Sequence, residues 1–150
     1  MTLERSFAMC FAAVVLLGCG KSDDMQAEGT PGEGGLTAAQ LAGTWNMRAV
    51  PFSGDSTPTM SVLKATPDMT GWTLTFPNRP GIATQVSFDA DSVMTESGPY
   101  ESVRKRGVQV TTTGVYRLRD SVIEGIATAR YMTRGVDSVM NFRVTGTRAP

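Results

Sequence analysis

Residues 108–119 read Val-Gln-Val-Thr-Thr-Thr-Gly-Val-Tyr-Arg-Leu-Arg. The even positions are mostly apolar or small, and the odd positions are mostly polar, with Val115 as the exception. A period of two is the pattern of a β-strand that has one buried and one solvated face. The stretch therefore predicts a strand whose inner face carries Val110, Gly114, Tyr116 and Leu118.

The same period recurs on both sides of this strand. It is clear around Trp45, Trp72, Ile82 and Met140, and looser over residues 60–66, 92–100 and 121–131. Short turn-forming segments such as Asn78-Arg79-Pro80-Gly81 separate the strands, which favours antiparallel hairpins. A sheet with one apolar face must close or be covered. We predict an all-β fold, a small eight-stranded antiparallel up-and-down barrel, with a two-sheet β-sandwich as the alternative.

Composition suits this fold and argues against several function classes. The 150 residues include 16 Gly and 8 Pro, and their 14 basic and 14 acidic groups leave no formal net charge. A balanced charge argues against nucleic acid as a partner. The chain has no histidine, which removes the commonest general base and the commonest metal ligand. We expect no enzyme, no catalytic residue, no cofactor and no metal site.

Three clusters of charge are interpreted as surface features. Asp89-Ala90-Asp91 is expected to form a hairpin turn rather than part of a calcium site. Arg104-Lys105-Arg106-Gly107 is expected to form a solvated turn, with contact to lipid phosphates as the alternative. The carboxylates that could form an acid–base pair are expected on the outer face, namely Glu96, Glu101 and Glu124.

The first residues carry the pattern of an export signal. Residues 7–18 form an uncharged run that ends at Leu16-Leu17-Gly18-Cys19. The run is shorter than the roughly 20 residues of a membrane-spanning helix and has the length of a signal-peptide apolar region. The last four residues resemble the lipobox of bacterial lipoproteins. That resemblance implies cleavage before Cys19 and attachment of lipid, palmitate included, to this cysteine. A buried apolar helix or an ordinary secretory signal is the alternative.

These patterns divide the chain into three parts. Residues 1–18 are predicted to be a lipoprotein signal peptide, residues 19–35 a lipid-anchored flexible linker and residues 36–150 the barrel domain. The sixteen residues from Gly20 to Gly35 would span about 20–24 Å as a flexible chain. By resemblance to lipoprotein sorting, Gly20 favours the outer membrane of a bacterial cell envelope, on its periplasmic face or its surface, over the inner membrane.

A short helical turn is predicted directly before the first strand. Thr37 is the candidate N-cap, and Gln40 is placed to complete a capping box. Gly43 is a plausible end of the turn.

The tripeptide Gly43-Thr44-Trp45 opens the first strand and resembles the Gly-x-Trp signature of lipocalins and related calycins. The resemblance implies that Trp45 plugs one end of the barrel and that an arginine late in the last strand packs over its ring. Arg148 has the inward phase of that strand, and Arg143 is out of phase.

The inward phase also supplies candidates for a ligand cavity. They are Met47, Trp72, Phe88, Tyr116, Ala127, Met140 and Phe142. Small inward residues suggest free space, and they are Gly114, Gly125, Ala127 and Ala129. A solid core is the alternative. We expect a non-enzymatic, lipid-anchored envelope protein that can hold a small apolar ligand inside the barrel. The alternative is a protein-interaction module, such as a protease inhibitor or a subunit of an envelope complex.

Overall fold

The computed structural model describes residues 34–133 and 138–150. The predicted signal peptide, the lipobox with Cys19 and the linker up to residue 33 lie outside the described residues, as does the turn at Arg134-Gly135. Among the residues that are described, no helix has both the length and the apolar character needed to cross a membrane.

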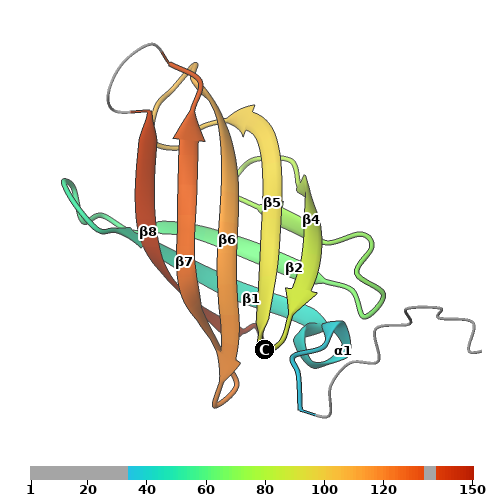
Figure 1. Cartoon of the computed structure of the whole chain (residues 1–150). Coiled ribbons are helices and arrows are strands. Elements are labelled where there is room, and N and C mark those ends of the chain that lie inside the picture. The colour runs from blue at the N-terminus through green and yellow to red at the C-terminus, as the bar shows by residue number, and fades with distance from the viewer. Residues whose placement is uncertain (1–33, 134–137) are drawn as a thin grey trace, which may run out of the picture.

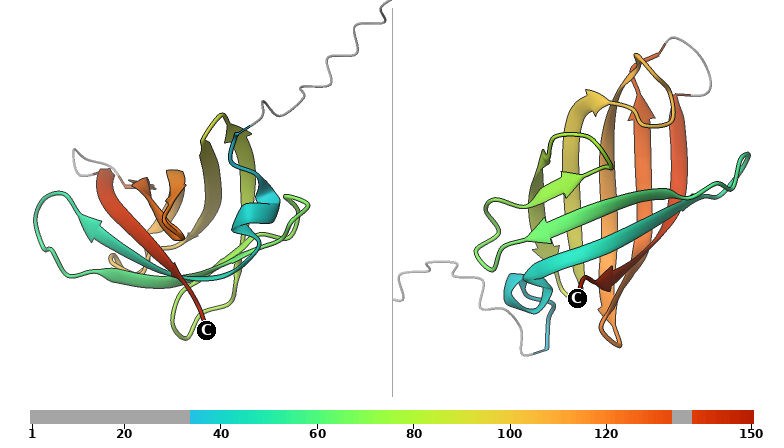
Figure 2. Two further views of the ribbon diagram at one scale, coloured as in Figure 1. Left: turned by 90° about the horizontal axis from the view of Figure 1, so that it is seen from below. Right: turned by 180° about the vertical axis from the view of Figure 1, so that it is seen from behind.

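The domain is an eight-stranded antiparallel barrel in which each strand pairs with the next and β8 pairs with β1 (Figures 1 and 2). One short helix precedes it. The elements are α1 (Ala38–Leu41), β1 (Gly43–Pro51), β2 (Thr59–Ala65), β3 (Thr73–Thr75), β4 (Ile82–Asp89), β5 (Ser92–Glu101), β6 (Gln109–Arg119), β7 (Val122–Tyr131) and β8 (Val139–Arg148). The closed up-and-down barrel is therefore confirmed, and the alternative of a two-sheet sandwich is wrong.

The predicted capping box is also present at α1. The Thr37 hydroxyl accepts a hydrogen bond from the Gln40 backbone N–H, and the Gln40 side chain accepts one from the Thr37 N–H at 2.8 Å. These two bonds satisfy N–H groups that a helix start leaves without partners. The Leu36 N–H donates to the Ala90 carbonyl at 2.9 Å and ties the start of the domain to the β4–β5 turn.

The strand order gives the barrel two different ends. We call one the helix end, because it holds α1, the β4–β5 and β6–β7 turns and the C-terminus (Figure 1). The opposite end, which we call the mouth, holds the β1–β2, β3–β4 and β5–β6 loops (Figure 2). The largest fully buried side chains are Trp45, Trp72, Leu41, Ile123 and Val93. Trp45, Leu41 and Ile123 lie toward the helix end, so the core is most solid there.

The predicted strand around Trp72 is shorter than the sequence pattern suggests. β3 has three residues, and Trp72 and Phe76 lie just outside it although both are buried. Gly71 has a φ of +70° on one side, and Pro77 follows Phe76 on the other. A residue in the left-handed region and a proline both interrupt the hydrogen-bond ladder of a strand. The apolar alternation in the sequence is therefore longer than the regular strand.

Candidate functional site

The helix end is closed by Trp45, which is fully buried. Its indole N–H donates to the Leu41 carbonyl at 2.7 Å. The guanidinium carbon of Arg148 lies 4.4 Å from the centre of the Trp45 ring, and the two residues face each other in the β1–β8 pairing. This is the contact that the resemblance to lipocalins implies, at the arginine that the strand phase selects.

Arg148 also binds the end of α1. Its two terminal nitrogens donate to the carbonyls of Gln40 and Ala42 at 2.7 and 2.8 Å. Together with the Trp45 bond, three successive carbonyls at the helix C-terminus have donors. Carbonyls in the last turn of a helix have no partner within the helix, and a positive charge is favourable there. Arg148 therefore joins the last strand, the first strand and the helix.

Gly43 is required by this arrangement for two reasons. Its φ is +129°, a backbone conformation that residues with a side chain rarely adopt. An added Cβ would also lie 2.8 Å from a terminal nitrogen of Arg148. The other arginine of the last strand, Arg143, points outward and lies 5.7 Å from the centre of the Phe52 ring. The Gly-x-Trp motif thus has a physical role in this chain.

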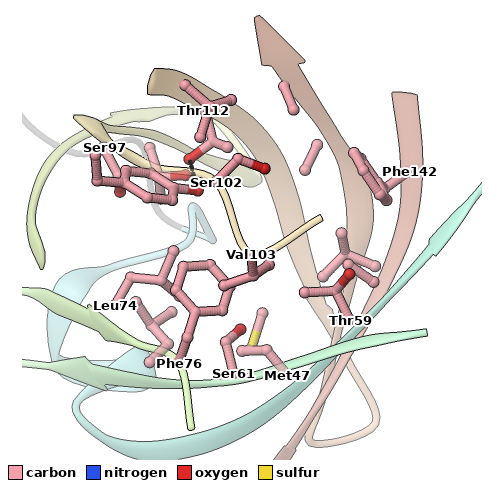
Figure 3. A pocket seen from close by; sticks show the side chains of 18 of the residues that line it. Met47, Thr59, Ser61, Leu74, Phe76, Ser97, Ser102, Val103, Thr112 and Phe142 are labelled. Atoms are coloured by element: carbon pink, nitrogen blue, oxygen red, sulfur yellow. Dashed lines mark hydrogen bonds between the residues drawn. The ribbon is translucent and has the colours of Figure 1, made fainter. Parts of the chain in front are cut away.

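A cavity of about 90 Å³ lies inside the barrel and opens at the mouth (Figure 3). Four of the predicted cavity residues line it, namely Met47, Tyr116, Ala127 and Phe142.

The other three predicted cavity residues are placed elsewhere. Trp72 is buried, donates to the Thr66 carbonyl at 2.9 Å and packs edge-on against Phe88, with ring centres 6.4 Å apart. Met140 packs against the core outside the cavity lining. The inward phase of a residue does not by itself show whether its side chain borders the cavity or fills the solid core.

The two inward glycines make room for a side chain of the protein. An added Cβ on Gly114 would lie 2.1 Å from the Tyr116 hydroxyl, and one on Gly125 would lie 2.0 Å from the Val115 carbonyl oxygen and 2.7 Å from the Tyr116 ring. Gly125 is the direct cross-strand partner of Tyr116. Tyr116 therefore occupies the space beside these glycines. Of the four small residues singled out in the sequence, Ala127 and Ala129 border the cavity.

The lining also carries many hydroxyl groups, which the sequence analysis did not single out. Thr84 and Ser97 are buried and share a hydrogen bond of 2.7 Å. The Tyr100 hydroxyl donates to the Thr112 hydroxyl at 3.4 Å. The available signal was the inward phase of these threonines and serines within otherwise apolar rows.

A β-bulge brings two further polar residues to the mouth. The β5–β6 pairing shifts register between Ser97 and Tyr100. The shift lets Tyr100 and Ser102 face the cavity together with Ser97. Gly98 stands at the bulge with a φ of +114°, and an added Cβ would lie 2.8 Å from the Val110 carbonyl oxygen. A prediction that continues the inward–outward alternation through β5 without a bulge assigns Tyr100 and Ser102 to the outer face.

The interior opposes the formation of charge. Desolvation raises the pKa of Tyr116 to about 12. Burial also raises the pKa of Tyr100 and of Tyr131, which line the same cavity. A neutral phenol is therefore favoured at all three positions.

Arg104 joins two loops at the mouth. Its guanidinium lies 3.2 Å from the Asp55 carboxylate and donates to the Thr57 carbonyl at 2.8 Å, so the β5–β6 loop holds the β1–β2 loop. Hydrogen bonds from Thr57, followed by the charge of Arg104, lower the pKa of Asp55. The interpretation of residues 104–107 as a freely solvated turn is therefore incomplete, because Arg104 has structural partners.

The remaining charged candidates lie on the outside. Glu96, Glu101 and Glu124 are exposed. Asp91 lies in the β4–β5 turn and pairs with Arg117 at 3.1 Å. Within residues 34–133 and 138–150, no group of three acidic, cysteine or histidine side chains could hold a metal ion.

The fold and cavity define a small up-and-down barrel with a plugged end and an open end. In comparisons with protein-family models, curated proteins and solved structures, nothing matches the chain. The resemblance to lipocalins thus rests on Gly43-Thr44-Trp45 and Arg148, and function must be argued from the barrel itself.

Replacing Arg148 by alanine should destabilise the domain. The variant loses two charge-assisted hydrogen bonds and the contact with Trp45, so we expect a loss of about 1–3 kcal/mol in the free energy of unfolding, measured in urea. Arg148→Lys should lose most of the same amount, because an ammonium cannot bind two carbonyls as a fork. Arg143→Ala is the matched control and should change stability by less than about 0.5 kcal/mol. Equal effects of the two alanine variants would contradict the role given to Arg148.

Alkaline pH should weaken the fold through Tyr116. In the folded protein, the pKa of Tyr116 lies above the ordinary tyrosine value of 10.0 that applies in the unfolded chain. The stabilisation of the neutral phenol is therefore complete below pH 10 and is lost as pH rises toward 12. We expect Tyr116 to account for a loss of roughly 2 kcal/mol over this range, measured by urea unfolding. Tyr116→Phe has no ionisable group there and should decline less steeply. Parallel pH profiles for the two proteins would contradict the assignment.

Proposed function

We propose that this chain is a non-enzymatic, lipid-anchored protein of the bacterial cell envelope whose barrel binds a small apolar ligand. The observation that carries the ligand proposal is the cavity, which is open at the mouth and lined largely by apolar side chains. Pockets that take small molecules are concave and mostly apolar, with a few polar groups that orient the ligand.

The anchoring part of the proposal rests on the sequence. The pattern Leu16-Leu17-Gly18-Cys19 precedes a linker that has almost no apolar side chain to bury. Each buried methylene of an acyl chain contributes about 0.8 kcal/mol to membrane affinity, so two or three chains anchor a protein stably. Gly20 supports the outer membrane as the destination.

The path of the chain supports combining an anchor with a binding cavity. The domain begins at the helix end, where Leu36 is bound to the β4–β5 turn. The cavity opens at the mouth, which is the opposite end of the barrel. The described chain therefore enters the barrel at the end that lies away from the mouth, which is compatible with an anchor that precedes Leu36.

A protein-interaction module is the second candidate, and one observation favours it. Met94, Val115 and Ile126 are 44%, 50% and 50% exposed, and they are direct neighbours on the outer face of β5, β6 and β7. Neighbouring exposed apolar residues are a common feature of protein interfaces.

The anchor is tested by changing Cys19 to serine in the expressed full-length chain. Without the thiol the lipid cannot attach, so we expect the protein to lose labelling by radioactive palmitate and to leave the membrane fraction. The matched control is Cys10→Ser, which lies in the predicted signal peptide and should label like the wild type. Labelling of the Cys19 variant would show that the anchor proposal is wrong.

Ligand binding is tested by native mass spectrometry of residues 20–150, which contain every strand of the closed barrel and its core. After exposure to an envelope lipid extract we expect a retained adduct. Ala127→Trp should abolish the adduct because Ala127 lines the cavity, whereas Ala83→Trp should keep it because Ala83 is exposed on β4. An unliganded mass for the wild type would overturn ligand binding. Photo-cross-linking from Val115 in intact cells would then test the second candidate.

A further inference from the structure

The walls of the cavity differ in polarity from one side to the other. Thr84, Ser97 and Thr112 form one row across β4, β5 and β6, in direct cross-strand register. The wall formed by β7, β8 and β1 is mainly apolar: Ala127, Ala129, Phe142, Val144 and Ala49 line it, and Tyr131 adds one phenol. Thr59 and Ser61 on the neighbouring β2 also line the cavity. Figure 3 shows Ser97, Ser102 and Thr112 together on one side of the cavity and Phe142 on another.

The hydroxyl row has spare capacity for hydrogen bonding. A hydroxyl has one donor hydrogen and two acceptor lone pairs. Either Thr84 or Ser97 can be the donor in their shared bond, and Thr84 can instead donate to the Ile82 carbonyl at 3.4 Å. The Tyr100 to Thr112 bond is long, at 3.4 Å. The row can therefore offer either a donor or an acceptor to a bound molecule without leaving a protein group unsatisfied.

The cavity has no free charge to match an ionised ligand. Among its lining residues, all of them within the described part of the chain, Arg104 alone is charged. One terminal nitrogen of Arg104 donates to the Thr57 carbonyl and the Thr59 hydroxyl. The other donates to the carbonyl and the carboxylate of Asp55. All four terminal N–H groups thus have acceptors within the protein.

An ion inside the cavity would be unfavourable for this reason. A buried charge without a partner costs much more free energy than a buried hydroxyl that can form a hydrogen bond. The raised pKa values of Tyr100, Tyr116 and Tyr131 report the same penalty for the protein's own groups.

We propose that the cavity selects a neutral molecule with a narrow apolar body and a hydroxyl or carbonyl group, and that this polar group binds Ser97 and Thr112. This inference rests on the proposed ligand-binding function and specifies the ligand class. The volume of about 90 Å³ is below the roughly 150 Å³ of a closed apolar cavity that takes up benzene. The enclosed part of the ligand is therefore small, and any longer part leaves through the mouth.

Three probes that share a six-carbon alkyl chain and differ in their polar group test this selection. They are 1-hexanol, which is neutral, hexanoate and hexylammonium, all at pH 7. Binding to residues 20–150 is followed by NMR through the methyl groups of Met47 and Ala127, which line the cavity. We expect 1-hexanol to bind at least about tenfold more tightly than either ion, because a tenfold change corresponds to about 1.4 kcal/mol. If hexanoate or hexylammonium binds as well as 1-hexanol, the selection is wrong although ligand binding stands. If no probe binds, both proposals fail.

Variants test where the polar group binds. Thr112→Val keeps the shape of the side chain and removes its hydroxyl, and Ser97→Ala removes the neighbouring hydroxyl. Each should weaken 1-hexanol binding by about three- to tenfold, as expected for one net hydrogen bond. Thr113→Val is the matched control, because Thr113 is exposed on the outer face of the same strand, and it should leave affinity unchanged. Wild-type affinity in both inward variants, with folding verified by circular dichroism, would overturn the assigned position.

Discussion

The pairing of β8 with β1 is the constraint on which the rest of the structure depends. It closes the sheet, and a closed sheet has no edge strands that could pair with another chain. Arg148 strengthens this closure, because it packs over Trp45 and also binds the carbonyls at the end of α1. The helix, the first strand and the last strand are thereby held by one side chain, although these segments are far apart in sequence.

The barrel is filled at the helix end and keeps free space toward the mouth. Trp45, Leu41 and Ile123 fill the interior toward the helix end and are almost completely buried. Toward the mouth, the inward positions are occupied by smaller residues such as Ala129 and Ser97. Space therefore remains where the side chains are short, so the solid core and the proposed binding site lie at different ends of one barrel.

The chemistry of this space follows from the absence of free charge in its lining. Arg104 is used to join two loops, and the tyrosines inside are held in the neutral form. A barrel with this interior can distinguish ligands by whether they are ionised as well as by how apolar they are. The hydroxyl row on β4, β5 and β6 would add a direction to the proposed selectivity, because the wall formed by β7, β8 and β1 is mainly apolar.

The sequence by itself determined the strands and their antiparallel order, because these features depend on local alternation and short turns. The contact of Trp45 with Arg148 was implied by the resemblance to lipocalins, and the strand phase then favoured Arg148 over Arg143. In the sequence, Gly114 and Gly125 suggest free space inside the barrel, but in the structure Tyr116 fills it from a neighbouring position. Only the tertiary structure therefore decided which inward residues border free space. The bulge at Gly98 changed the phase of β5 and brought Tyr100 and Ser102 inward. The physical reason is that a cavity is what remains after side chains from several strands have packed, and strand alternation specifies a direction for each side chain but not the volume that its neighbours occupy.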